Sequence, residues 1–215
     1  MITAFHKDTF DRIPDEKRAR IIEIATAEFA GKGFDNANIN DIAEKAGISV
    51  GSLYKYFDSK ENFFLTCVSF GIETLQVVLS DALESDEDIM VKTEKMLRLI
   101  QKHTRENRDL IRLYNEITSE SNSALVKKLS RELEEISANA YTTLIRQAQE
   151  KGEIREDADP QLCAFFADSL FMMLQFSYAC EYYQERFRIY AGENIFDRDE
   201  AVVQQFLRFI KAALK

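Results

Sequence analysis

The stretch that decides the fold is NINDIAEKAGISVGSLYKYF, residues 38–57. It begins as a short amphipathic helix, stops at Gly47, and restarts after Ser49. Asn38 and Ser49 are residue types that cap helix N-termini, and Asp41 follows Asn38 at the spacing of a capping box. Glycine readily adopts the left-handed conformation that follows a helix end. The stretch therefore predicts two short helices joined by a three-residue turn, which is a helix-turn-helix.

Side-chain size predicts which faces of these helices are buried. Small Ala43 suits a close helix crossing, and Leu53 and Phe57 can anchor the second helix in a core. The start of such a helix can enter the major groove of DNA, while tyrosine hydroxyls and a lysine further along can bind phosphates. The alternative is an ordinary helical hairpin with tyrosines on its surface. The outward positions of the second helix are Val50, Gly51, Ser52, Tyr54, Lys55 and Tyr56.

The composition predicts an all-α protein. The chain has 215 residues, of which 46% are hydrophobic, so it can bury a sizeable core. It contains only 7 Gly and 2 Pro, and so few helix breakers over this length favour helices over a sheet with many turns. No segment shows sustained alternation of apolar and polar residues, which a half-buried strand would require.

Cysteine usage and the N-terminus predict a cytoplasmic protein. The three cysteines are odd in number and form no CxxC pair, which indicates reduced thiols. The N-terminal residues MITAFHKDTF lack a basic segment followed by an apolar run, so no signal peptide is expected.

The formal net charge of −9 is unevenly distributed along the chain. Residues 1–60 hold 9 Lys+Arg against 10 Asp+Glu, and residues 61–215 hold the other 19 against 27. The acidity therefore lies mostly in the second part. DNA binding remains compatible with this charge if a local patch in residues 1–60 faces the phosphates.

Capping signals and apolar spacing predict the remaining helices. Pro14 and the acids after it suit a first helical turn, and Gly31 or Gly33 should end that helix. Ser59 can cap a long helix that runs to about Leu83. Further helices are predicted over 88–105, 108–119, 123–151, 160–187 and 198–215.

The most apolar stretch is CAFFADSLFMMLQFSYAC, residues 163–180. It is nearly long enough to span a bilayer, but it carries Asp168 and Gln175 and has no basic flank at its start. We therefore expect a helix that is buried on most sides, and no membrane partner.

Residues 21–64 read IIEIATAEFAGKGFDNANINDIAEKAGISVGSLYKYFDSKENFF. A first helix that ends in a Gly-Phe turn is followed by the pattern DIA..AGIS.GSLY.YF..K. This multi-position pattern, across roughly residues 17–65, resembles the TetR (tetracycline-repressor) family of bacterial transcriptional regulators. The rest of the chain resembles the family only in its length and helical character.

The resemblance implies an all-α fold with two domains. Residues 1–60 would form an N-terminal three-helix helix-turn-helix DNA-binding domain. Residues 61–215 would form a larger helical ligand-binding and dimerisation domain, which brings the chain to about nine helices. The implied function is a ligand-responsive homodimeric repressor that a small, largely apolar effector releases from a palindromic operator in double-stranded DNA.

The resemblance also implies roles for individual residues at the DNA. Asn38 and Ser49 match helix-start positions that hold phosphate, and Lys60 begins the next helix, whose N-terminus can meet another phosphate. Many family members have lysine where this chain has Val50, so contact with a thymine methyl is expected in place of a cation on guanine. Val50, Gly51 and Ser52 match the positions that meet base edges, and Tyr54, Lys55 and Tyr56 match phosphate-contacting positions.

In the family, the last two long helices pair with those of a second subunit, and their other sides close a ligand cavity. Here these helices would be about 160–187 and 198–215. Plain core or dimer packing is the alternative for any single residue of the apolar run. The cavity candidates are Tyr114, Tyr141, Phe166, Met173 and Phe176, with Asn115 and Gln175 as possible polar contacts.

No pattern in the chain predicts an enzyme, a cofactor or a metal site. His6 and His103 are the only histidines and lie in no metal-binding spacing, and neither GxGxxG nor GKS/T occurs. The alternative function is a helical small-molecule-binding protein, or an enzyme, that kept the fold without operator binding. The sequence does not identify the effector, the operator, the regulated genes or the direction of the response.

Overall fold

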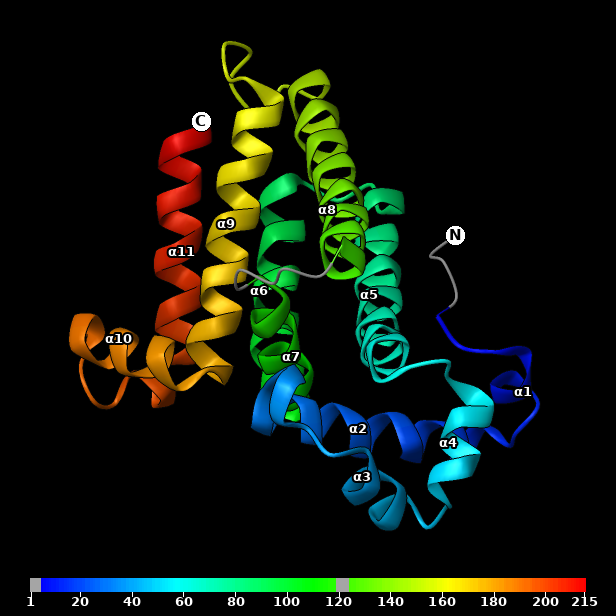
Figure 1. The fold of residues 1–215 in the computed structure, drawn as a ribbon. Helices are drawn as coiled ribbons and strands as arrows, with labels where there is room; N and C mark the ends of the chain where they lie inside the picture. Colours follow the sequence, from blue (N-terminus) through cyan, green and yellow to red (C-terminus); the bar gives the residue numbers. More distant parts are fainter. Residues whose placement is uncertain (1–4, 119–123) are drawn as a thin grey trace. The chain divides into compact units, whose positions relative to one another are not determined.

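The computed structural model describes residues 5–118 and 124–215, and every regular element in these ranges is helical (Figure 1). The all-α prediction is therefore confirmed, and eleven α-helices and one 3-10 helix lie where about nine helices were expected. The predicted helix limits at 119 and 123 lie outside the described residues. The helices are α1 (Asp8–Asp11), α2 (Asp15–Asn36), α3 (Ile39–Ala46), α4 (Val50–Tyr56), α5 (Lys60–Glu84), α6 (Ile89–Glu106), α7 (Arg108–Thr118), α8 (Ala124–Glu150), α9 (Pro160–Ala179), α10 (Glu181–Ala191), the 3-10 helix η1 (Ile195–Asp197) and α11 (Asp199–Leu214).

Two compact units make up the chain. The N-terminal unit comprises Met1–Leu75 and Arg112–Glu132, and the C-terminal unit comprises Gln76–Ile111 and Leu133–Lys215. Three helices, α5, α7 and α8, therefore pass from one unit into the other. These units are defined by packing, and the functional domains 1–60 and 61–215 stay a prediction.

The N-terminal unit is built around an aromatic core. Phe29 of α2 meets Phe63 and Phe64 of α5 edge to face, at ring distances of 5.9 and 5.2 Å. Phe57, directly after α4, stacks on Phe63 at 4.1 Å. All four rings are almost completely buried, and such pairs add to the stability that buried area alone provides. This core fixes α2 and the end of α4 to the first turns of α5.

The end of α2 follows the predicted glycine signal. Gly33 has φ 73° and ψ 167°, so the regular helix breaks there although helical turns continue to Asn36. A β-carbon at this position would lie 3.1 Å from the carboxylate oxygen of Glu116, which belongs to α7 in the same unit. Positive φ and this close approach both favour glycine.

The C-terminal unit packs α9 against α6 and α10, and α11 against α6. The α9 and α11 helices run side by side (Figure 1), with Phe171 stacked on Phe206 at a ring distance of 5.4 Å. Among the described residues, α9 is the one helix long and apolar enough to cross a membrane, judged by length and composition. Only 39% of its apolar window is buried, which is less than the sequence suggested.

The prediction of one helix over 160–187 is wrong. Cys180 is extended, with φ −101° and ψ 131°, and it separates α9 from α10. Tyr178 explains the break, because its hydroxyl donates to Asp199 at 2.9 Å and its ring lies 6.2 Å from that of Phe187 in α10. The carbonyl of Tyr178 accepts a hydrogen bond from the Gln184 side chain at 2.9 Å. Tertiary contacts therefore stop the helix where no glycine or proline does.

Asp168 is a half-buried acid within the apolar α9 helix. Burial, with the negative charge of Glu134 as a second cause, raises the pKa of Asp168 to about 6. The protonated form is therefore favoured in the folded protein, and ionising Asp168 above pH 6 costs stability. This cost is absent once the pH falls below the pKa of the unfolded chain.

We expect Asp168→Asn to stabilise the protein at pH 7.5 by about 1–3 kcal/mol, because it removes a charge that burial disfavours. The gain should shrink as the pH falls from about 6 to about 4. Denaturant unfolding at several pH values measures it. Glu134→Gln should give a smaller gain in the same direction, and a gain from Asp168→Asn that is equal at pH 4 and pH 7.5 would contradict this assignment.

Candidate nucleic-acid interface

The turn between α3 and α4 has the predicted geometry. Gly47 is left-handed, with φ 70° and ψ 33°, and its N–H donates back to α3. The Ser49 hydroxyl accepts from the N–H of Ser52 at 3.1 Å, and the Asn38 side chain accepts from the N–H of Asn40 at 2.9 Å. Both predicted caps are therefore present, and three residues separate the two helices. This is the geometry of a helix-turn-helix.

The predicted capping box at the start of α3 does not form. Buried Glu28 of α2 accepts from the N–H of Asn38 at 3.2 Å, the role expected for Asp41. The Asp41 carboxylate instead accepts from Lys32 at 3.0 Å. Glu28 also binds Lys32 at 2.6 Å and Lys45, in the last turn of α3, at 3.1 Å. One carboxylate therefore holds both ends of α3 to α2.

Electrostatics keep Glu28 ionised in this position. Burial alone would raise the pKa of Glu28, but the hydrogen bonds from Lys32, Lys45 and the Asn38 N–H lower it to about 2. The role of Glu28 was not predicted, because its sequence context suggests an exposed i,i+4 pair with Lys32. Two features of the sequence could have indicated a buried, paired Glu28. The apolar Phe29, which is buried, follows it directly, and Lys45 in the next helix offers a partner for its charge.

The outer face of α4 holds the residues predicted to meet DNA. Leu53 is buried, whereas Tyr54 is half exposed and Gly51 and Lys55 are exposed. Among the described residues, no hydrogen-bond or ion-pair partner of the Lys55 ammonium is present. A free cation on an outward helix face is suited to a phosphate contact. Val50, Ser52 and Tyr56 are half-buried, and Asn38 and Ser49 are exposed.

An N-terminal segment that the sequence did not predict closes the end of α4. The ammonium of Lys7 donates to the carbonyl of Tyr54 at 3.0 Å, and its backbone N–H donates to the carbonyl of Tyr56 at 2.8 Å. The Thr9 hydroxyl donates to the carbonyl of Lys55 at 2.5 Å. The last carbonyls of a helix lack partners within it. Residues 7–9 therefore fix the backbone that carries the predicted phosphate contacts.

Lys60, at the start of α5, is engaged within the unit. Its ammonium donates to the carbonyl of Asp35 at 3.0 Å and lies 5.1 Å from the centre of the Phe34 ring. The Ser59 hydroxyl accepts from the N–H of Asn62 at 3.0 Å, which confirms the predicted cap. One hydrogen bond leaves two of the three N–H donors of the ammonium for other partners, and the phosphate contact of Lys60 stays a prediction.

The predicted ligand-binding residues do not share one environment. Tyr141 is buried and stacks on Phe171 at 5.7 Å, and Phe176 is also buried. Phe166 and Met173 are exposed and therefore do not line the interior of their own unit. Gln175 is half-buried in the C-terminal unit, and Tyr114 and Asn115 lie on α7 in the N-terminal unit. The ligand-binding role of all seven stays a prediction.

Comparisons with known proteins agree with this geometry. The model of the family described as "Bacterial regulatory proteins, tetR family" matches residues 21–67. The HTH-type transcriptional repressor KstR2 of Rhodococcus jostii is 46% identical over 46 residues, which cover 21% of this chain and 22% of the repressor. The chain spans 29%, 52% and 36% of the length of three other curated regulators that it matches, YfiR and YdgC of Bacillus subtilis and FasR of Mycolicibacterium smegmatis.

Solved structures extend the likeness to the whole fold. A TetR family transcriptional regulator from Chloroflexus aurantiacus has a TM-score of 0.68 and 23% identity, over 97% of this chain and 98% of the other. FadR from Bacillus subtilis, solved in complex with stearoyl-CoA, has a TM-score of 0.68 and 16% identity, over 88% and 97%.

The α2–α4 region is thus a helix-turn-helix of the kind found in bacterial regulatory proteins. Residues 21–67 match the tetR family of bacterial regulatory proteins, and the whole chain has the fold of a solved TetR family regulator.

We expect Glu28→Gln to destabilise the protein by about 1–3 kcal/mol at pH 7, because Lys32, Lys45 and the Asn38 N–H lose a charged partner. The lowered pKa stabilises the folded state above the unfolded pKa, and this stabilisation is lost as the pH falls toward 2. The difference between variant and wild type should therefore narrow below about pH 4.5, as denaturant unfolding would measure.

Glu23→Gln is the matched control, because Glu23 is an exposed acid on the same helix. Its free energy of unfolding should stay within about 0.5 kcal/mol of wild type. Equal losses in the Glu28 and Glu23 variants would show that Glu28 does not have this structural role.

Proposed function

We propose that the protein is a ligand-responsive, homodimeric DNA-binding transcriptional regulator, and most specifically a repressor. The observation that carries the proposal is the outer face of α4. It presents the unpaired Lys55 and the half-exposed Tyr54 on a helix that Ser49 caps at one end and Lys7 and Thr9 close at the other. Both the family match and the solved structures support this reading.

The proposed roles at the DNA follow from position along α4. Val50, Gly51 and Ser52 form the first turn, which enters the major groove and meets base edges. A β-carbon on Gly51 would have only Ser49 nearby, at 3.8 Å, so the absence of a side chain there favours close approach of the helix to DNA. Lys55 and the tyrosines lie further along and bind phosphates, which position the helix without reading sequence.

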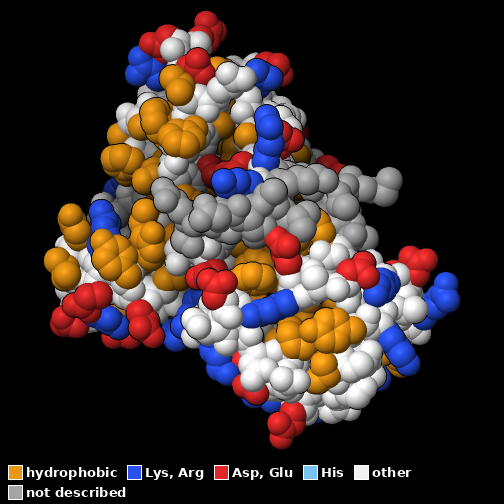
Figure 2. Space-filling view, viewed as in Figure 1, with side chains coloured by type: hydrophobic (Ala, Val, Ile, Leu, Met, Phe, Trp, Pro, Cys, Tyr) orange, Lys and Arg blue, Asp and Glu red, His pale blue; other side chains and the backbone are white. Residues whose placement is uncertain are grey.

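An exposed apolar face on α9 and α11 supports the proposed homodimer. Phe165 is 64% exposed and Phe209 is 62% exposed. Figure 2 shows hydrophobic side chains gathered over these helices, whose positions are given in Figure 1. Contiguous apolar surface of this kind marks an interaction site. The residues that form this face, which we call the α9–α11 face, are Leu162, Phe165, Phe166, Met173 and Phe209.

This proposal assigns the apolar character of α9 to packing against a second subunit, in a cytoplasmic protein without a membrane partner. A two-fold dimer carries two copies of α4 and therefore fits a palindromic operator with half-sites about one helical turn, or a multiple of it, apart. A small, largely apolar effector would release the repressor by favouring a different arrangement of the two copies of α4.

Relatives support both the repressor role and regulation by a small molecule. KstR2 is described as a repressor, and the FadR structure contains stearoyl-CoA. The alternative is a helical ligand-binding protein or an enzyme that lacks operator binding. The intact caps of α3 and α4 and the unpaired Lys55 favour the regulator.

We expect Lys55→Ala to weaken DNA binding by at least about tenfold, because each subunit then lacks one charged partner for a phosphate. The slope of the logarithm of the DNA association constant against the logarithm of the salt concentration should become shallower by about one for each phosphate that loses its lysine contact. Lys17→Ala, which removes an exposed lysine from α2, is the control and should change neither quantity. Fluorescence anisotropy on the protein's own upstream DNA at several salt concentrations measures both.

The base preference of DNA binding distinguishes residues that contact base edges from residues that contact phosphates. Val50→Lys should change the preferred base at one position in each half-site, whereas Lys55→Ala should weaken all sequences alike. A changed preference with an unchanged salt slope in Lys55→Ala would contradict the roles assigned to α4. Failure of the wild-type protein to bind any upstream fragment would favour the alternative function.

The α9–α11 face can be tested without DNA. Phe165→Glu places a charge in the proposed interface and should weaken dimerisation by about 100-fold or more, because burying two unpaired carboxylates costs several kcal/mol. Sedimentation equilibrium measures the dimer fraction. Val91→Glu changes an exposed apolar residue of α6 and is the control. A dimer that survives Phe165→Glu unchanged, or a wild-type monomer, would reject this interface.

A further inference from the structure

A polar cleft lies where α6, α7, α9, α10 and α11 approach one another in the C-terminal unit. It encloses about 400 Å³, within the range of small-molecule sites. None of the seven predicted effector residues lines it. Its lining residues are Arg105, Arg108, Tyr178, Gln184, Arg188, Phe196, Asp197 and Asp199.

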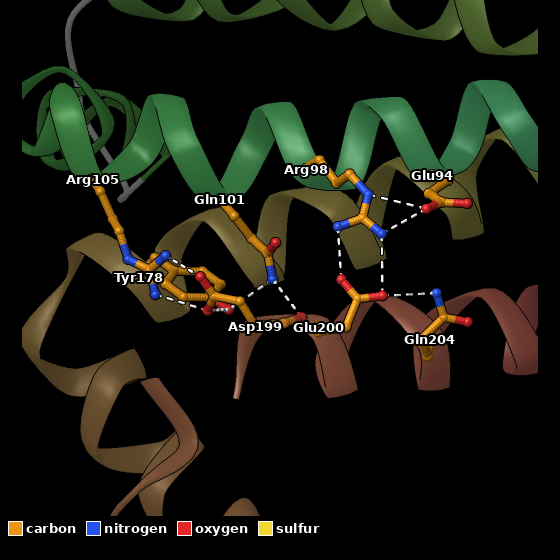
Figure 3. A network of polar contacts seen from close by, with 8 residues as sticks. All are labelled: Glu94, Arg98, Gln101, Arg105, Tyr178, Asp199, Glu200 and Gln204. Carbon is orange, nitrogen blue, oxygen red and sulfur yellow. Dashed lines mark hydrogen bonds and ion pairs between the residues drawn. The ribbon is translucent and has the colours of Figure 1, made fainter. Parts of the chain in front are cut away.

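One arginine of the cleft is already neutralised (Figure 3). Arg105 of α6 pairs with Asp199 through both guanidinium nitrogens and also donates to the carbonyl of Phe196 at 3.0 Å. Tyr178 donates its hydroxyl to Asp199 at 2.9 Å, and Gln101 donates to that hydroxyl at 3.0 Å. Arg105 lowers the pKa of Asp199, so this carboxylate stays ionised. Arg105 and Asp199 therefore balance each other's charge.

The other two arginines of the lining have no buried ionic partner among the described residues. Among the described residues, no hydrogen-bond or ion-pair partner of Arg108 is present. Arg188 has Glu185 at 3.3 Å and Glu193 at 3.9 Å, and the side chains of both acids are mostly exposed to solvent. Exposed pairs of this kind contribute little. Asp197 is the remaining acid of the lining itself, whereas Glu185 and Glu193 lie outside the lining.

Aromatic rings hold the arginines in place. The guanidinium carbon of Arg188 lies 5.1 Å from the centre of the Phe196 ring, and that of Arg105 lies 4.9 Å from the centre of the Tyr178 ring. The two rings meet edge to face at 5.8 Å. Stacking restricts a guanidinium while its N–H groups point outward in its own plane, where a carboxylate or phosphate can replace the exposed contacts of Arg188 with Glu185 and Glu193.

We propose that this cleft is a binding site for a small organic anion, in which Arg108 and Arg188 bind a carboxylate or phosphate group. The flat apolar part of the ligand lies against Phe196. The site is separate from the effector site proposed above and takes ligands of opposite character. The two guanidinium groups can bind the anionic group of such a ligand, and the aromatic ring can contact its flat apolar part.

Binding of phenyl phosphate, benzoate and neutral benzyl alcohol to the full chain tests the site. Titration calorimetry at pH 7.5 and low salt, without DNA, keeps the result independent of the proposed function. We expect phenyl phosphate or benzoate to bind with a dissociation constant in the millimolar range or below, and benzyl alcohol to bind at least tenfold more weakly. The stronger of the two anions identifies the anionic group that the site prefers.

The double variant R108Q/R188Q should bind the preferred anion at least tenfold more weakly than wild type. Arg186→Gln removes an exposed arginine of α10 outside the cleft and is the matched control, with binding expected within twofold of wild type. Asp197→Asn should bind severalfold more tightly, because a repelling carboxylate is removed; loss of structure cannot produce this gain. Circular dichroism confirms that each variant is folded.

The proposal is overturned if neither anion binds wild type at 10 mM, or if benzyl alcohol binds as tightly as the anions. It is also overturned if folded R108Q/R188Q keeps wild-type affinity, or if Arg186→Gln weakens binding as much. Should the double variant fail to fold, the single variants R108Q and R188Q, together with Asp197→Asn, decide the question in the same way.

Discussion

The helix-turn-helix depends on one buried carboxylate. Glu28, whose side chain is only 3% exposed, has three donors: Lys32, Lys45 and the backbone N–H of Asn38. An ionised group is buried at acceptable cost only when it is paired and hydrogen-bonded. Lys32 lies in α2 itself, and the other two donors, Asn38 and Lys45, lie at the two ends of α3. Since α3 is joined to α4 by only three residues, the contact that orients α3 on α2 also constrains α4, the helix proposed to bind DNA.

Local signals predicted the helix-turn-helix well, and long-range contacts account for what was missed. The caps at Asn38, Ser49 and Ser59 and the left-handed Gly47 use interactions between near neighbours, which a sequence displays directly. The break at Cys180 depends on Tyr178 reaching Asp199, and the closure of α4 depends on residues more than forty positions earlier. No spacing rule reports such contacts. The same limit applies to a predicted ligand cavity, since burial of each side chain is set by its neighbours in space.

Polar contacts organise the C-terminal unit as apolar ones organise the core of the N-terminal unit. Arg98 binds Glu94 in its own helix and Glu200 of α11, and Arg105 binds Asp199 one residue earlier in α11 (Figure 3). These pairs fix the register of α6 against the start of α11 through the geometry of bidentate arginine contacts. The sequence separation of almost one hundred residues explains why this register could not be predicted. Arg108 lies three residues after Arg105, at the start of α7, and α7 continues into the N-terminal unit.

The closure of α4 by residues 7–9 has a consequence for how the protein is made. Domains generally fold during synthesis from the N-terminus, and every contact from α1 to the end of α4 lies within the first 58 residues. The α4 helix, which we propose to be the DNA-facing helix, can thus be completed on the ribosome before α9 and α11 have been synthesised. Residues 112–132 of the same unit emerge only after α6, so their docking is a later and separate step. The order of translation therefore permits the DNA-facing helix to form before the face that would pair two subunits exists.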